Sequence, residues 1–275
     1  MGRIHVGISG WTYPAWRGDF YPAGLRQKDE LAYAGERLTS IEINGSFYSL
    51  QRPTSYAAWR DQTPDDFVFS VKGPRYVSHL KRLADSEVPL ANFFASGVPA
   101  LGGKLDVVLW QLPPNFRFDA DRLAGFLPLL PRTTVEAAEL AKQHDDKVPD
   151  DRALTTATED TRIRYALEVR HDSWKEQSAE VVALLREHDV ALVVADTAGR
   201  WPYLEELTAE GHVYARLHGD KELYASGYTT RALDRWAEKV RGWADDGLDV
   251  FVYFDNDAKG FAPHDAMALI DRVGR

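Results

Sequence analysis

The chain contains no cysteine, which excludes a disulfide framework, a thiolate metal site and a cysteine nucleophile. It also lacks any apolar run approaching the roughly 20 residues that a membrane-spanning helix needs. The opening residues, MGRIHVGISGW, are too short and too polar for a secretory signal and are typical of a first strand. We therefore expect a cytoplasmic protein with no membrane partner.

Basic residues are outnumbered, with 33 Lys and Arg against 42 Asp and Glu and a net charge of -9. That balance argues against general binding of duplex DNA, which depends on many cationic contacts. It does not decide the charge of a single pocket, because local charge can oppose the net sign. The sequence also has no P-loop, GxGxxG, HExxH or GxSxG motif.

Short β-rich runs alternate with helical patterns along the chain, and the length of 275 residues suits one large α/β domain. The eight runs are 4–9, 39–44, 67–72, 106–112, 163–170, 190–196, 212–218 and 249–255. The clearest helical patterns are 34–38, 122–130, 180–188, a long helix capped by Thr229 or Thr230 and stopped at Gly247, and 263–273. This order predicts a single (β/α)₈ TIM-type barrel over 1–275, with a doubly wound open sheet as the alternative.

The segment 131–162 interrupts this pattern, because it is polar and rich in Asp and Thr. We interpret it as an inserted short helix at about 136–144 followed by an exposed loop. Since the insertion precedes the fifth strand, we expect it at the bottom of the barrel, away from any chemistry.

Polar residues gather where the predicted strands end. Because side chains alternate along a strand, Ile41 and Ile43 point outward and Glu42 points into the barrel. The same count gives the inward set Asn44, Lys72, Glu168, Arg170, Arg216 and His218. Ser9, Gln111 and Asp255 also lie at strand ends, but the count does not fix which face they are on. Asp196 shares the face of Leu192 and Val194. Barrel enzymes build their sites at this end, so we predict a pocket.

A structural alternative is a plug of salt bridges that has no function. In that arrangement Glu42 pairs with Lys72, Glu168 with Arg170 and Asp196 with Arg216.

Two loops follow these strands with unusual composition. SGWTYPAWRGDFYP carries Trp11, Tyr13, Trp16, Phe20 and Tyr21, and it is either a lid that packs on itself or a stacking platform helped by Trp174 and Trp201. KGPRYVSHLKR has basic residues and no acid, and its Lys72 and Arg75 are candidates for holding a phosphate or carboxylate.

These segments together resemble the YecE-like family, a domain of unknown function. The resemblance rests on GISGWTYPAWRGDFYP, IEINGSFYSLQRP, FVFSVKGPRYVSHLKRL, LWQLPPNF, ALEVRHDSW, VVADTAG, YARLHG and VYFDNDAKGFAPHDA, in order along the chain. It implies a TIM-type barrel and supplies no activity. The positions that match the family's signature are Asn44, Phe47, Tyr48, Lys72, Arg75, His79, Gln111, Glu168, Arg170 and Asn256, whereas Trp110 and Asp255 depart from it.

The function that we favour from the sequence is hydrolysis of a phosphate ester or phosphodiester in a small anionic or nucleotide-like substrate. Catalysis is assigned to Glu168, Glu42 and Lys72, with Glu168 or Glu42 as general base. Substrate contacts are assigned to Arg170, Arg75, Asn44, Tyr48, Gln111, Arg216, His218, Asn256, Trp11 and Trp174. A divalent metal cofactor is left open, with candidate ligands Glu42, Glu168, Asp196, His218 and Asp255.

Two other functions stay open. One is a carbohydrate-active enzyme that uses Glu42 and Glu168 as its carboxylate pair. The other is a protein that binds a nucleotide or a nucleic-acid end without chemistry, and it predicts that both glutamates are locked in salt bridges. The sequence does not indicate an oligomeric state.

Overall fold

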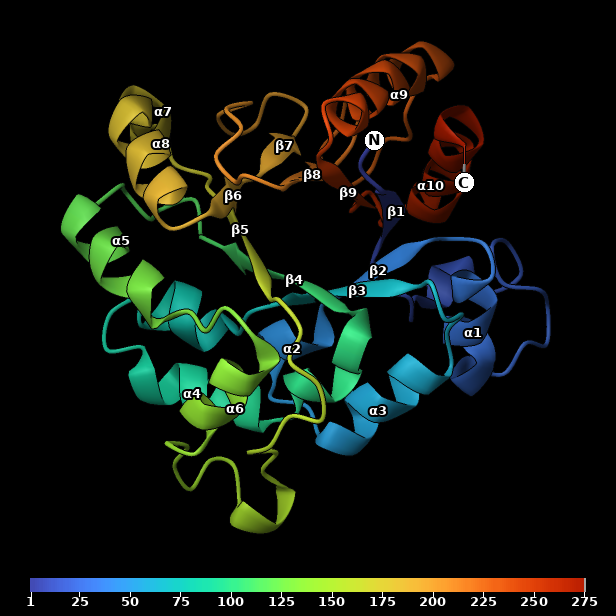
Figure 1. Cartoon of the computed structure of the whole chain (residues 1–275). Helices are drawn as coiled ribbons and strands as arrows, with labels where there is room; N and C mark the ends of the chain where they lie inside the picture. The colour runs from blue at the N-terminus through green and yellow to red at the C-terminus, as the bar shows by residue number, and fades with distance from the viewer. Residues whose placement is uncertain (275) are drawn as a thin grey trace.

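The computed structural model describes residues 1–274 and shows parallel strands in a nearly closed barrel with helices outside it (Figure 1). The strands are β1 Ile4–Ser9, β2 Ser40–Ile43, β3 Val68–Lys72, β4 Leu105–Gln111, β5 Arg164–Glu168, β6 Val190–Leu192, β7 Val194–Asp196, β8 His212–Leu217 and β9 Asp249–Phe254. Their order in the sheet is β6-β5-β4-β3-β2-β1-β9-β8-β7. The predicted barrel is confirmed, and no helix within residues 1–274 is long and apolar enough to cross a membrane.

One predicted strand, 190–196, is divided in two. β6 pairs with β5, β7 pairs with β8, and only Val193 separates them. The Val193 N–H donates to the Leu167 carbonyl at 3.0 Å, so the chain passes from one neighbour to the other at this residue. The two edges of the sheet are therefore consecutive in sequence, which explains nine strands where the sequence predicts eight.

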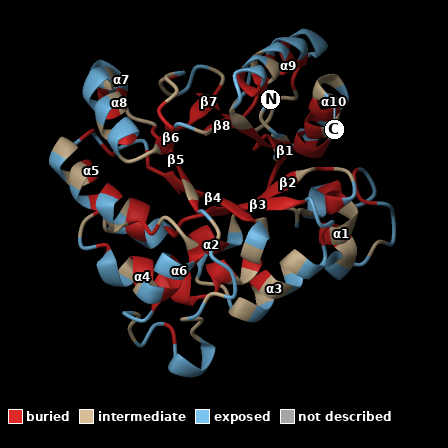
Figure 2. Cartoon of the chain, in the orientation of Figure 1, coloured by how far each residue is buried: buried red, intermediate tan, exposed pale blue. Residues whose placement is uncertain are grey.

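The helices surround the barrel and bury their apolar faces against it (Figure 2). They are α1 Glu30–Gly35, α2 Gly45–Tyr48, α3 Pro53–Asp61, α4 Glu87–Ala95, α5 Ala120–Phe126, α6 Thr134–Ala141, α7 Ser173–Glu176, α8 Ser178–Glu187, α9 Thr230–Asp245 and α10 Phe261–Val273. The predicted cap of α9 is present, because the Thr229 hydroxyl accepts a hydrogen bond from the Ala232 N–H. Gly247, with φ of 90°, follows the end of that helix.

Inside the barrel, a layer of aromatic side chains lies below the mouth. The Tyr253 hydroxyl lies 2.5 Å from Ser40 Oγ and 2.7 Å from Ser70 Oγ, and its ring packs 5.1 Å from that of Tyr214. Phe251 continues this inner core toward the amino ends of the strands. These aromatic side chains fill the barrel interior below the polar residues.

The polar segment 131–162 forms the predicted helix as α6, but its placement differs from the expectation. α6 packs against α4, and Asn92 of α4 donates to Asp145 at 2.9 Å. Lys147 then places its ammonium 4.8 Å from the centre of the Tyr76 ring, in the loop after β3. Because Lys147 also lines a groove with Phe47 and Tyr48, which follow β2, part of the insertion reaches the mouth end of the barrel wall.

Candidate active site

A single guanidinium lies at the centre of the polar ring. Arg216, on β8 and with no exposed surface, donates from Nη2 to Glu42 Oε1 at 2.8 Å and from Nη1 to Glu168 Oε2 at 2.6 Å. Its Nη2 also lies 3.1 Å from Asp255 Oδ2 and 3.1 Å from Ser9 Oγ. One buried cation therefore holds the three carboxylates that the parity of the strands predicted to meet.

Glu42 and Glu168 are fully committed to these bonds. Glu42 also accepts from the Tyr214 hydroxyl at 2.7 Å, and Glu168 accepts from Arg170 Nε at 2.6 Å. Burial alone would raise the pKa of Glu168, but the guanidinium groups of Arg170 and Arg216 hold it well below its usual range. Neither glutamate has exposed surface, so neither is placed to act as a general base on a substrate.

Only one of the three pairs in the structural alternative is present, that between Glu168 and Arg170. Glu42 bonds to Arg216 instead of Lys72. Asp196 does not reach Arg216, because it lies on the outward face of its strand with Leu192 and Val194.

The candidate metal ligands do not form a metal site. The Arg216 guanidinium lies between Glu42, Glu168 and Asp255, and His218 Nδ1 lies 2.9 Å from Asp255 Oδ2. Asp196 is on the other face of the barrel wall. Within residues 1–274 no group of three His, Asp or Glu side chains is arranged to hold a metal ion. A cation already occupies the position that a divalent ion would need, so this donor set does not fit a resident metal.

A pocket of about 580 Å³ opens above the ring at the carboxyl ends of the strands. It brings together five of the predicted catalytic and substrate-binding residues, Asn44, Tyr48, Lys72, Gln111 and Arg170, and the candidate metal ligand Asp255. The remaining lining residues are Tyr13, Pro14, Ala15, Phe47, His79, Tyr224, Asp257 and Ala258. The location agrees with the expectation that the pocket lies at the mouth of the barrel.

Lys72 differs from the other charged groups because it has no partner. Its side chain is 8% exposed, and among residues 1–274 its ammonium makes no hydrogen bond or ion pair. The ammonium lies 4.4 Å from the centre of the Phe47 ring. Burial, together with the nearby charge of Arg216, lowers the pKa of Lys72 to about 8. Lys72 thus presents an amine that changes charge near neutral pH.

Asp257 is a pocket residue that sequence reasoning missed. It is half-buried in the loop after β9, and its Oδ1 has no hydrogen-bond partner in the described part of the chain. Burial and the neighbouring negative charge of Asp255 raise the pKa of Asp257 to about 8, so its carboxyl keeps its proton to a higher pH than an ordinary aspartate does. The signal was available, because Asp257 follows Asp255 by two residues and continues the inward parity of β9.

Arg170 is fixed from two sides and keeps donors for a ligand. Its Nε bonds to Glu168, and its guanidinium lies 3.9 Å from the centre of the Trp201 ring. The other guanidinium nitrogens carry no hydrogen bond within residues 1–274, and Arg170 lines the pocket. Tyr224, also missed from the sequence, packs its ring 5.3 Å from that of His218 beside them.

Several predicted contacts lie outside this pocket. Arg75 is exposed and lines an adjoining groove of about 190 Å³. Asn256 is buried, and its amide donates to Ser226 and Asp265. Arg216 and His218 are fully buried and lie in the ring, not in the pocket wall.

The predicted tryptophan contacts are structural in this fold. Trp174 has no exposed surface and donates its indole N–H to the Phe116 carbonyl at 2.9 Å. Trp11 packs edge-on against Trp59 with ring centres 5.3 Å apart. The aromatic loop after β1 packs on itself, with Trp16 buried at its centre, so of its aromatic residues only Tyr13 reaches the pocket.

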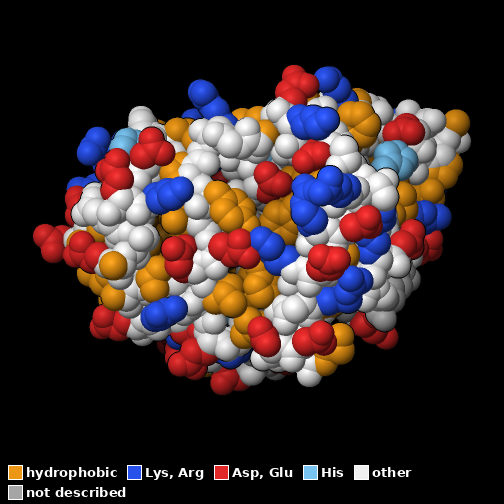
Figure 3. All heavy atoms as spheres, turned by 90° about the horizontal axis from the view of Figure 1, so that it is seen from above, with side chains coloured by type: hydrophobic (Ala, Val, Ile, Leu, Met, Phe, Trp, Pro, Cys, Tyr) orange, Lys and Arg blue, Asp and Glu red, His pale blue; other side chains and the backbone are white. Residues whose placement is uncertain are grey.

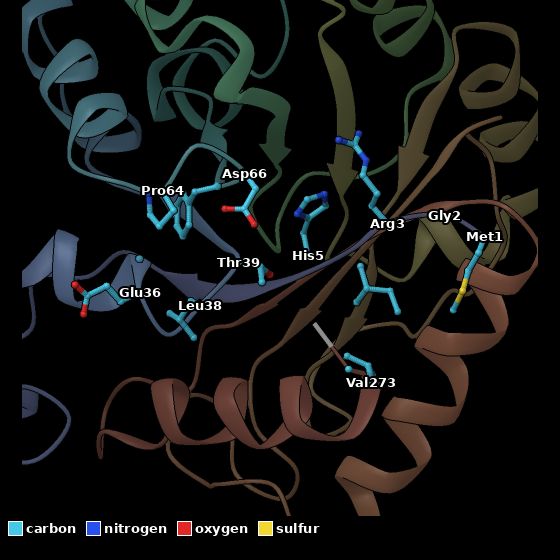
Figure 4. A pocket seen from close by; sticks show the side chains of 14 residues that line it. Met1, Gly2, Arg3, His5, Glu36, Leu38, Thr39, Pro64, Asp66 and Val273 are labelled. Atoms are coloured by element: carbon cyan, nitrogen blue, oxygen red, sulfur yellow. The ribbon is translucent and has the colours of Figure 1, made fainter.

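A second cavity, of about 510 Å³, lies at the amino ends of the strands (Figure 4). Its wall includes Arg3, His5, Thr39 and Asp66, which Figure 4 shows around β1. Neither ring nitrogen of His5 has a hydrogen-bond partner among residues 1–274. None of the predicted site residues lines this cavity, so we place the candidate site at the opposite end.

Comparison with known proteins identifies the family. The family described as "Protein of unknown function DUF72" matches residues 5–275. The chain belongs to the DUF72 family. Among solved structures, a DUF72 protein from Thermotoga maritima MSB8 superposes with a TM-score of 0.75 at 26% identity, covering 98% of both chains. A DUF72 protein from Enterococcus faecalis V583 gives a TM-score of 0.74 at 18% identity, covering 98% of this chain and 95% of the other, which shows the shared fold.

Two curated proteins are similar in sequence to this DUF72 member. The UPF0759 protein YunF of Bacillus subtilis (strain 168) is 22% identical over 300 residues, covering 98% of this chain and 94% of the relative. The UPF0759 protein YecE of Escherichia coli (strain K12) is 29% identical over 113 residues. That second match spans 41% of this chain and 39% of the length of the Escherichia coli protein. The resemblance to the YecE-like family is thereby confirmed.

Proposed function

We propose that this DUF72 protein hydrolyses a small phosphate ester bound at the mouth of the barrel. The observation that carries the proposal is a shared pocket wall, in which Lys72 and Arg170 have donors without protein partners and the Asp257 carboxyl has an unpartnered oxygen and a raised pKa. A phosphate group accepts hydrogen bonds and charge from both cations.

The chemistry assigns new roles to the ring residues. Water attacks phosphorus while the ester P–O bond breaks, and Asp257 gives its proton to the departing oxygen. A proton from the attacking water then restores Asp257, so the reaction is balanced. Phosphoryl transfer has a loose transition state that needs positioning and charge more than a strong base. Glu42 and Glu168 act as positioning residues that hold Arg216 and Arg170.

A binding protein without chemistry is the second candidate, because it predicts that Glu42 and Glu168 are locked in salt bridges, as they are here. On the face shown in Figure 3, acidic and basic side chains intermingle, and neither kind forms a continuous patch across it. That distribution favours a small anion over duplex nucleic acid as the ligand. Sugar hydrolysis by Glu42 and Glu168 is disfavoured because neither carboxylate reaches the pocket.

The test combines binding with turnover. We expect inorganic phosphate to bind the purified protein in titration calorimetry, and a panel of phosphate monoesters to include a substrate. Asp257→Asn should lower kcat by about 100-fold with phosphate binding retained, whereas Lys72→Met should abolish phosphate binding. Lys259→Met is the matched control, because Lys259 is exposed and pairs with Glu222 at 3.2 Å. Phosphate binding without any turnover would support the binding protein, and absence of both would contradict the proposal.

A further inference from the structure

Lys72 has a property that phosphate binding does not use. A lysine that is desolvated and lies near another cation loses its proton easily, and the neutral amine is then a nucleophile toward carbonyl carbon. Lys72 meets both conditions, since Phe47 covers its ammonium and Arg216 lies nearby in the ring. By contrast, Lys104 donates to the Arg60 carbonyl at 2.7 Å and to the Thr63 carbonyl at 2.8 Å, which keeps its amine engaged.

We propose that the Lys72 amine forms an imine with small 2-oxo acids, whose carboxylate is held by the free guanidinium nitrogens of Arg170. This inference goes beyond hydrolysis and rests on the proposed function only for the shared anion subsite. Lys72 and Arg170 line the same pocket from β3 and from the end of β5. Burial lowers the pKa of His79 in this wall and the charges of Lys72 and Arg170 lower it further, so both cations lie near the same residue.

The steps balance within the pocket. The Lys72 nitrogen attacks the carbonyl carbon, and the carbonyl oxygen takes the proton of Asp257 to give a carbinolamine. The nitrogen passes a proton to the Asp257 carboxylate, Asp257 then protonates the hydroxyl, and the hydroxyl departs as water while the C=N bond forms. Asp257 recovers its proton from the nitrogen, so amine plus carbonyl gives imine plus one water.

The two ligand classes compete for Lys72 in opposite protonation states. A bound phosphate stabilises the ammonium, whereas imine formation needs the neutral amine. With a pKa of about 8, Lys72 is neutral in roughly a tenth of molecules at pH 7, compared with less than about 0.1% for an ordinary lysine. Phosphate should therefore slow imine formation at this residue.

The experiment traps the imine by reduction. The whole protein is incubated with sodium pyruvate and sodium cyanoborohydride at pH 7, and the products are followed by intact mass and peptide mapping. Hydride adds to the imine carbon, which leaves a stable secondary amine. We expect one reduced pyruvate on Lys72, formed at least about tenfold faster than on any surface lysine, and no such product in Lys72→Met. Lys104→Met and Lys259→Met should label like the unmodified protein.

Further arms separate this inference from the proposed hydrolase. Acetaldehyde replaces pyruvate as a carbonyl probe without a carboxylate, and Arg170→Met should slow trapping of pyruvate while sparing acetaldehyde. Trapping at Lys72 that phosphate does not slow supports the imine and contradicts the phosphate site. Labelling spread evenly over surface lysines, in a protein that still binds phosphate, overturns the imine and leaves the hydrolase standing.

Discussion

The two ends of the barrel each carry a network of arginine and carboxylate groups, but in only one of these networks does every charged group have a partner. At the amino ends of the strands, Arg164 bonds to Asp106 and, at 2.9 Å, to Asp249. Arg3 also bonds to Asp249, at 3.0 Å. Two cations and two carboxylates meet there, and each charged group has a partner.

At the mouth the numbers of positive and negative groups are also equal, but one cation has no carboxylate partner. Arg216 bonds to Glu42, Glu168 and Asp255, and Arg170 shares Glu168. The third cation, Lys72, is left without a carboxylate and opens onto the pocket. A purely structural plug has no reason to keep a buried ammonium unpaired, because burial of such a group is costly. This difference supports the proposed ligand site at the mouth, whereas every charged group of the network at the amino ends has a protein partner.

The largest effect is expected at the centre of the mouth network. Arg216→Met leaves three carboxylates buried without their common cation, so we expect a loss of about 3–5 kcal/mol in the free energy of unfolding. Arg164→Met should cost less, because Asp249 keeps Arg3 and the site is nearer to solvent. Denaturant unfolding of both variants measures the difference, and equal losses would remove the contrast between the two ends.

Replacing the unpaired Lys72 should raise the free energy of unfolding instead of lowering it. Lys72→Met removes an ammonium that is costly to bury, so the variant should be more stable at pH 7 by roughly 3 kcal/mol, given a pKa lowered from 10.5 to about 8. Between those two values the unfolded chain holds more protons than the folded one, and the stability of the unmodified protein therefore rises with pH. Lys104→Met is the comparison, and it should destabilise because its amine caps carbonyl groups.

Asp257 should make stability depend on pH in the reverse direction. Its folded pKa is raised from 3.8 to about 8, so the stability that it contributes is full below 3.8 and is lost as the pH rises through 8. Asp257→Asn should match the unmodified protein at pH 4 and be more stable at pH 9. Thermal unfolding at the two pH values tests this, and a constant difference between the proteins would contradict the assignment.

The smallest effect is expected for Trp201, whose indole ring contacts the Arg170 guanidinium. Trp201→Leu removes a cation–π contact of about 0.5–1 kcal/mol, so phosphate affinity should fall by a few fold without a change in fold. Trp174→Phe is the matched variant in the core, where stability and not affinity should decrease. Calorimetry and denaturant unfolding of both variants distinguish the two tryptophans.

The order of strands and helices was enough to predict the barrel. Alternation of side chains along the strands predicted the inward ring of Glu42, Lys72, Glu168 and Arg216. It did not predict the ion pairs, because strand parity gives the face of a residue and not its position around the barrel. That position depends on register, which gave Arg216 the carboxylate expected for Lys72.

Loop residues were predicted less well for a related reason. Nothing in the pattern around Trp174 distinguishes a buried indole from one that faces a ligand. Asp257 was overlooked because it lies past the end of β9, where parity is not normally extended. The division of strand 190–196 at Val193 follows from closing the ring, a constraint that only the complete sheet imposes.

The most direct test of the account is the titration of Lys72 itself. Lysines carrying ¹³C at Cε are followed by NMR across the pH range, and Lys72→Met assigns the signal. We expect a Lys72 pKa of about 8 that rises when inorganic phosphate is added. A pKa near the ordinary value of about 10.4, unchanged by phosphate, would show that Lys72 has a partner and would contradict the claim that the mouth holds an amine free for a ligand.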